Sequence, residues 1–247
     1  MPASAQITDT VDTADTASLP PVVNTGPVDE SAIPTGVVIM PRTHPEKIVF
    51  SQFKLSKDVP DFEAFAANSP FVEKAEEIDK TAMMLSEYNR LSNRFNLYDE
   101  NQDIVVHTQL KVDQYSSMNN LLVFDELDEK TFFRFSMYGY NVGIVPENVQ
   151  QFNQIRISPS RATEMFRELS GNQYVTAEFV LKPIYADKKE PFTMNGNDFW
   201  LMFARIGEVR LWTNGSRNAK LVWFYHAPWY TPSAQQGLDN LFSQQRN

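Results

Sequence analysis

The residues that could carry out chemistry begin with three histidines, His44, His107 and His226. An imidazole acts as a base or a metal ligand where carboxylates or further ligands lie beside it. The sequence has no HExxH or GxSxG spacing that would place them there. His107 lies on the polar side of an alternating run, which is typical of a surface histidine. His226 remains a candidate because it falls among aromatic residues, where it could serve a hydrolase as the base.

Four acids, Asp125, Glu126, Asp128 and Glu129, could supply the paired carboxylates of a glycoside hydrolase. Such pairs need a desolvated site that separates their pKa values, whereas acids this close in sequence are typical of a solvated turn. The nine glycines form neither GxxxxGK nor GxGxxG, and the chain has no cysteine for a thiol nucleophile, a disulfide or a thiolate metal site. The sequence therefore predicts a protein that is not an enzyme and that holds no metal or cofactor.

Aromatic residues near the end of the chain carry the binding signal. The candidate binding residues are Trp223, Tyr225, His226, Trp229 and Tyr230. Since side chains alternate along a strand, neighbouring rings point to opposite faces of the sheet. Rings on an uncovered face could form a platform for a sugar or a peptide, or pack against another subunit. The competing interpretation is that both faces are covered, or that the sheet closes into a sandwich, and that the rings are core.

The elements that must position these rings are strands. Long apolar runs at 199–203, 208–212 and 221–225 predict antiparallel strands with a bulge at Gly207 and a turn at Asn214-Gly215-Ser216. Further strands are predicted at 106–112, 121–124 and 131–138 from alternation or β-branched and aromatic content, and another at 47–55 from its composition.

Two helices are predicted to cover this sheet. Ser69 and Pro70 open a long amphipathic helix of about seven turns that runs to Phe95, with Ile78 and Leu85 on its apolar face. A short helix follows Ser158-Pro159 and ends at Gly171. The fold class that these elements predict is α+β, with a mainly antiparallel, aromatic-rich sheet.

Polar segments flank the predicted single domain, which we place at 47–232. Residues 1–46 hold seven prolines, six acids and no aromatic residue, which predicts a flexible, disordered acidic tail. Within it, the apolar run Gly36–Met40 could add an edge strand to the chain's own body or to a partner. Residues 233–247 form a second polar tail.

Charge and hydropathy limit the partners. A net charge of -9 argues against nucleic acid and against an anionic membrane surface, and no run of 18 apolar residues could span a membrane. The small residues Ala3-Ser4-Ala5 resemble the context of a signal-peptidase site, which favours a periplasmic or secreted bacterial protein, with a cytoplasmic protein as the alternative.

These observations favour a non-enzymatic protein-interaction or assembly module. It would dock to a protein partner, or to further copies of itself, through the aromatic sheet face and an exposed edge. The alternatives are a carbohydrate-binding module with an aromatic platform and a hydrolase that uses His226.

Overall fold

The structure, a computed structural model, describes residues 37–214 and 219–232, and most of both predicted tails lies outside these ranges. The helices are α1 (Pro45–Ser56), α2 (Phe62–Ala67), α3 (Pro70–Glu73), α4 (Lys80–Leu97), the 3-10 helix η2 (Val149–Phe152) and α5 (Pro159–Leu169). The strands are β1 (Ile104–Lys111), β2 (Gln114–Ser116), β3 (Leu121–Val123), β4 (Phe133–Met137), β5 (Tyr140–Pro146), β6 (Gln154–Arg156), β7 (Tyr174–Ala186), β8 (Phe192–Met194), β9 (Asn197–Trp212) and β10 (Leu221–His226).

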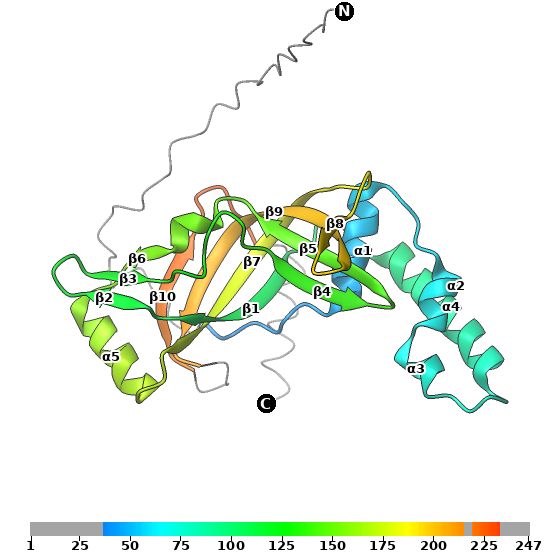
Figure 1. Ribbon diagram of the computed structural model, residues 1–247, viewed down its shortest axis with the longest axis horizontal. Helices are drawn as coiled ribbons and strands as arrows, with labels where there is room; N and C mark the ends of the chain where they lie inside the picture. Colours follow the sequence, from blue (N-terminus) through cyan, green and yellow to red (C-terminus); the bar gives the residue numbers. More distant parts are fainter. Residues whose placement is uncertain (1–36, 215–218, 233–247) are drawn as a thin grey trace, which may run out of the picture.

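A seven-stranded sheet forms the centre of the molecule (Figure 1). Its order is β1-β7-β9-β5-β4, with β8 and β10 also paired to β9. Every pairing is antiparallel except that of β5 with β9. The sheet curves into a nearly closed barrel rather than a sandwich, and a smaller sheet, β2-β3-β6, lies beside it. The predicted α+β class and the mainly antiparallel sheet are confirmed.

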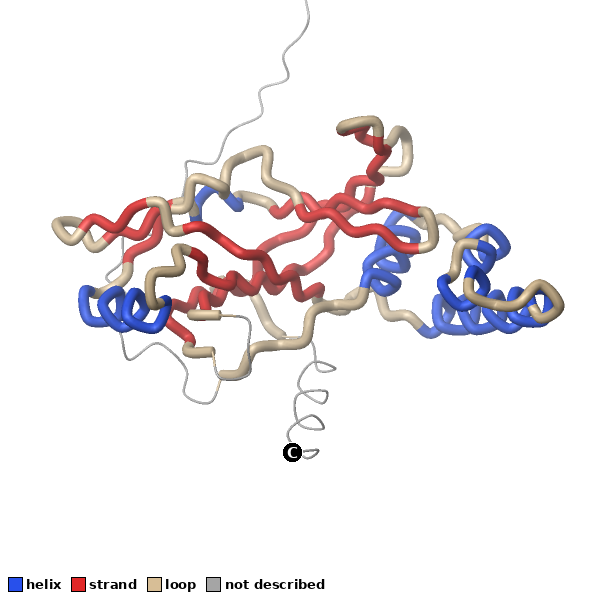
Figure 2. The backbone as a smooth tube through the Cα atoms, turned by 60° about the horizontal axis from the view of Figure 1, so that its bottom comes forward, coloured by secondary structure: helices blue, strands red, loops and turns tan. Residues whose placement is uncertain are grey.

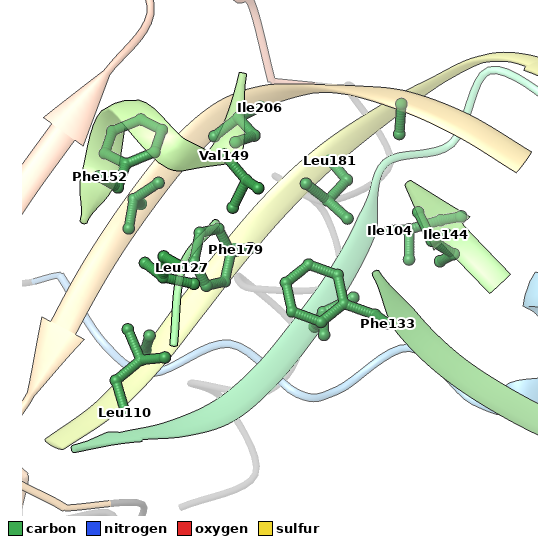
Figure 3. Close-up of a cluster of buried hydrophobic side chains, with 14 of the residues drawn as sticks. Ile104, Leu110, Leu127, Phe133, Ile144, Val149, Phe152, Phe179, Leu181 and Ile206 are labelled. Carbon is green, nitrogen blue, oxygen red and sulfur yellow. The ribbon is translucent and has the colours of Figure 1, made fainter. Parts of the chain in front are cut away.

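The main core lies inside this curved sheet (Figure 3). Phe179 from β7 and Phe133 from β4 meet with ring centroids 5.2 Å apart, and Ile104, Leu110 and Leu181 fill the space around them. Residues of β7 with odd numbers face this core, so Glu178 and Val180 must face the opposite side. That opposite side is called the outer face below.

The three apolar runs at 199–225 form two strands rather than three. The first two are continuous in β9, and the predicted bulge at Gly207 is confirmed, because Val180 pairs with Glu208 while Leu181 pairs with Ile206. The third run is β10, which pairs antiparallel with β9 as predicted. The predicted turn between them is described only at Asn214, and its other residues lie outside the described ranges.

Gly207 lets the ring of Tyr230 approach the backbone of β9. A Cβ at this position would lie 2.4 Å from Cδ2 of Tyr230, which is closer than real carbon atoms come. We expect Gly207→Ala to lower the free energy of unfolding by about 1–3 kcal/mol, the usual cost of overpacking. Urea denaturation measures this loss. Gly207 does not have a positive φ, so the loss reports the contact with Tyr230 and not backbone strain; an unchanged midpoint for Gly207→Ala would contradict the close packing.

The strand predicted at 47–55 is wrong, because these residues form helix α1. His44 caps the helix by accepting a hydrogen bond from the Glu46 N–H, and Pro45 occupies the first turn. Ile48, Val49 and Phe50 are all buried, and α1 packs against β4, β5 and β7 of the sheet. Helix capping and burial outweigh the β propensity of this run.

The long helix predicted from Pro70 to Phe95 is also wrong in length and in place. It is split into α3 and α4 by a turn at 74–79. Glu73, Glu76 and Glu77 would lie three and four residues apart on one continuous helix, where like charges destabilise it. These helices do not cover the sheet: α3 and α4 pack with α2 into a unit that projects from one end of the barrel (Figures 1 and 2).

The other predicted elements are found. Ser158 caps α5, Ser170 and Gly171 end it with positive φ, and Ala162, Met165 and Leu169 are buried. Strands β1, β3 and β4 occupy the alternating and aromatic runs at 106–138. The expected edge strand at Gly36–Met40 is not formed by Val37–Met40. Met40 is nevertheless buried on the outer face, so this segment docks on its own domain.

Candidate functional site

Trp223 and Tyr225 belong to the core of the domain. Trp223 is 2% exposed, and its indole N–H donates to the Arg156 carbonyl at 2.9 Å. The rings of Trp223 and Tyr225 are stacked, and both contact Phe152. Tyr225 is partly buried, and this burial raises the pKa of its phenol. These two rings do not offer a free stacking surface.

Tyr230 is buried, whereas its neighbour Trp229 is exposed. Tyr230 is 5% exposed, and its hydroxyl donates to Asp103 Oδ2 at 2.8 Å. Burial, and then this hydrogen bond, raise the pKa of Tyr230 well above that of a free tyrosine. Trp229 is 47% exposed, with the Arg205 guanidinium 5.8 Å from its ring. Of the four candidate rings only Trp229 is exposed, so they do not form the platform that the carbohydrate-binding alternative requires.

His226 ends β10 beside a carboxylate. Its Nδ1 lies 3.0 Å from Glu208 Oε1, and its side chain is 40% exposed. Glu208 also accepts a hydrogen bond from Arg210 Nε at 3.0 Å, so this carboxylate belongs to an ion pair. The ring of His226 contacts Phe224 and Tyr230. Within the described part of the chain, no hydroxyl nucleophile is hydrogen-bonded to His226. The hydrolase alternative therefore has a carboxylate beside its proposed base but lacks a nucleophile there.

These charges continue across the outer face as one row. Arg210 Nη1 contacts Glu178 Oε1 at 2.7 Å, and His107 Nε2 lies 3.4 Å from the other oxygen of Glu178. We call His107, Glu178, Arg210, Glu208 and His226 the outer-face ladder. Strand register produces it, because β1, β7, β9 and β10 are consecutive neighbours.

The outer-face ladder fixes a segment of the chain to the sheet. The Met40 N–H donates to Glu178 Oε2 at 2.8 Å, and the Met40 side chain packs with Val105, Val180 and Tyr230. Thr43 is hydrogen-bonded to Val105 through both its backbone N–H and its hydroxyl. The outer face is thus covered by the chain itself along this row. This covered part of the outer face, around Val105, Val180 and Tyr230, serves the fold.

Exposed apolar side chains gather instead on the unit formed by α2, α3 and α4, which we call the helical arm. Leu85 is 63% exposed and Ile78 is 87% exposed, although both were predicted to be buried against the sheet. Phe71 of α3 is also largely exposed. The first half of α4 extends beyond α2, so these side chains have few neighbours of the same chain.

A groove lies between α2 and the first half of α4. Its volume is about 380 Å³, and its walls are mainly apolar. It is lined by Glu63, Thr81, Met84, Leu85 and Tyr88. Thr81, Leu85 and Tyr88 are four and three residues apart, so they share one face of α4. The same stripe continues toward the end of the helix, where Leu91 and Phe95 are buried. We call this feature the α4 groove.

The helical arm that carries the α4 groove is rich in exposed acids. Residues 61–81 contain six acids, Asp61, Glu63, Glu73, Glu76, Glu77 and Asp79, against two lysines. All six are exposed. Among the described residues only Glu77 of this set forms an ion pair, with Lys80 at 2.6 Å. Asp61 caps α2. The other carboxylates are free to attract a cationic group.

An ion-pair cluster joins the helical arm to the barrel. Arg90 of α4 contacts Glu46 of α1 at 2.9 Å and Glu87 at 2.7 Å, and Arg94 contacts the second oxygen of Glu46 at 2.8 Å. Tyr138, between β4 and β5, donates to Glu46. We call these residues the anchor cluster. The hydrogen bond from Arg90 is the main reason why the pKa of Glu87 is lowered.

Neither the outer-face ladder nor the anchor cluster was predicted from the sequence. Glu178 interrupts the apolar run Val175–Leu181, and Arg210 similarly interrupts the end of β9; a charge at one point of a buried strand signals a paired partner. Glu46 and Arg90 are 44 residues apart, so no local pattern connects them. The α4 groove was missed because its apolar residues were assigned to the core.

Comparisons with protein-family models, with curated proteins and with solved structures each found no match. In residues 37–214 and 219–232, no helix is long and apolar enough to cross a membrane. The same residues contain no group of three or more histidine, aspartate or glutamate side chains arranged to hold a metal ion.

Proposed function

We propose that this protein is a non-enzymatic interaction or assembly module that binds a protein partner through the α4 groove. The observation that carries the proposal is the exposed apolar face of α4, where Leu85 and Tyr88 line a groove that the rest of the described chain leaves open. Exposed apolar patches on a folded domain mark interaction sites. A groove between two helices suits the insertion of large side chains from a partner.

The anchor cluster supports this proposal. Arg90 and Arg94 hold α4 to α1 through Glu46, whose side chain is almost fully buried. The second half of α4 is thereby fixed while its first half projects. A groove held in place before binding loses less conformational entropy when a partner enters.

Leu85 should contribute little to folding. Because Leu85 is 63% exposed and Leu91 is 0% exposed on the same helix, Leu85→Ala should change the free energy of unfolding by less than about 0.5 kcal/mol. Leu91→Ala should lower it by about 2–4 kcal/mol. Urea denaturation of both variants checks this difference. Equal losses would show that Leu85 is a core residue and would remove the basis of the proposed site.

Photo-crosslinking tests the binding itself. A photo-reactive amino acid at position 85 should capture a partner in an extract of the native organism, whereas the same amino acid at position 184 serves as the control. Ile184 is also an exposed apolar residue, but it lies on β7. The protein captured only from position 85 is then purified and mixed with the intact chain. The same set of products from both positions, or no binding by the purified pair, would reject the site.

A further inference from the structure

We infer that the partner segment bound in the α4 groove is a basic amphipathic helix, with large apolar side chains on one face and lysine or arginine beside them. This inference rests on the proposed function and specifies the partner of the same site. It follows from two features of the helical arm, an apolar groove lined by Glu63 and a set of exposed acids within residues 61–81.

The shape of the α4 groove suits side chains presented by a helix. Its volume is about 380 Å³, and it is open to solvent along one side, so that side chains of a partner can enter it. Met84, Leu85 and Tyr88 give it apolar walls along α4. Helices bound in such grooves insert side chains at positions i, i+3, i+4 and i+7, which lie in a row along the groove.

The acids near the groove favour a partner with positive charge. Glu63 lines the groove itself, and Glu73, Glu76 and Asp79 lie in the neighbouring α3–α4 region without an ion pair among the described residues. Carboxylates at the rim of an interface increase the association rate of a cationic partner and disfavour an anionic one. An acidic or neutral helix would bring no charge to balance them.

The same charges disfavour a second copy of this chain as the occupant. Two arms packed through their α4 grooves would bring two acidic rims together, and the whole chain already carries a net charge of -9. Like charges placed opposite each other oppose association. The structure therefore favours a basic partner over self-association.

The test uses a fluorescein-labelled peptide of about 18 residues, or five helical turns. Leucine occupies i, i+3, i+4 and i+7 positions and lysine occupies the rest, and a matched peptide carries glutamate in place of every lysine. Fluorescence anisotropy measures binding of each peptide to the intact chain. The lysine peptide should bind, the glutamate peptide should not, and Leu85→Asp should weaken binding of the lysine peptide by about 30-fold, as loss of a hot-spot side chain does.

Two triple variants separate the rim from the overall charge. Glu63→Lys/Glu73→Lys/Glu76→Lys reverses the rim, and Glu100→Lys/Glu129→Lys/Glu190→Lys makes the same change in net charge at exposed positions elsewhere. Only the first should abolish binding of the lysine peptide. Equal weakening by both variants would overturn the inference, because the attraction would then be non-specific.

The failure of this inference differs from failure of the proposed function. If the glutamate peptide bound as well as the lysine peptide and Leu85→Asp weakened both, the groove would be a docking site without a preference for a basic partner. If neither peptide bound, and sedimentation showed a dimer that Leu85→Asp dissociates, the occupant would be a second copy. Both results overturn the basic partner and leave docking at the α4 groove in place.

Discussion

Replacing Arg210 with Met should lower the free energy of unfolding by about 3–5 kcal/mol, because two buried carboxylates then lose their cation. Glu178 is 0% exposed, and Arg210 contacts it at 2.7 Å. The same guanidinium also pairs with Glu208. For a chain of this size the loss corresponds to a fall of about 10 °C in the midpoint of thermal unfolding. Urea titration and calorimetry measure both quantities.

The triple variant Arg210→Met/Glu178→Gln/Glu208→Gln is the control for this interpretation. If unpaired charge causes the loss, removing both charges should restore part of the stability despite adding two substitutions. Equal stability of the triple and single variants would mean that the packing of Arg210, and not its charge, accounts for the effect.

The anchor cluster should show a loss of similar size. Arg90→Met removes the contacts that join Glu46 and Glu87, whose carboxylates are both nearly fully buried, and we expect a loss of about 3–5 kcal/mol. Burial of the pair distinguishes it from a surface ion pair, which contributes about 0–1 kcal/mol.

Arg205→Met provides the surface comparison. Arg205 contacts Glu147 at 3.2 Å, but both side chains are largely exposed. Its replacement should change the free energy of unfolding by less than about 0.5 kcal/mol in the same urea titration. A loss for Arg90→Met no larger than that for Arg205→Met would show that the helical arm is not held to the barrel by the anchor cluster.

The sheet could be predicted from the sequence because alternation and turn residues are local signals. Residues 106–112 place apolar Val106, Leu110 and Val112 on one side, and Gly207 interrupts an aromatic run where a bulge is needed. The parallel pairing of β5 with β9 and the closure of the barrel depend on contacts between distant strands. No local pattern specifies this pairing or this closure, so the same strands are equally consistent with an open or sandwich-like sheet.

The helices show where local patterns mislead. The residues of α1 have strand propensities, and capping at His44 and Pro45 together with burial makes them helical. Ile78 and Leu85 have the spacing of a core-facing helix. The spacing predicts an apolar face correctly, but it does not tell whether the chain's own sheet or a partner covers that face.

The binding site predicted at the aromatic strand also depends on which side chains the chain's own fold covers, and the sequence does not show this. Trp223 and Tyr230 are large amphipathic residues that serve equally well in a core or at an interface. Their burial follows from Tyr230 lying over Gly207 and from Trp223 bonding to Arg156, contacts between segments far apart in sequence. Trp229 remains exposed, as expected for a residue that follows Pro228.

The most direct test of the account compares Leu85→Asp with Trp229→Ala in calorimetric titrations against the partner captured from position 85. If the α4 groove is the docking site and the aromatic segment is not, Leu85→Asp should weaken binding by about 2 kcal/mol or more, and Trp229→Ala by less than about 0.5 kcal/mol. The opposite order, with Trp229→Ala abolishing binding and Leu85→Asp leaving it unchanged, would contradict the account and return the site to the end of the aromatic strand.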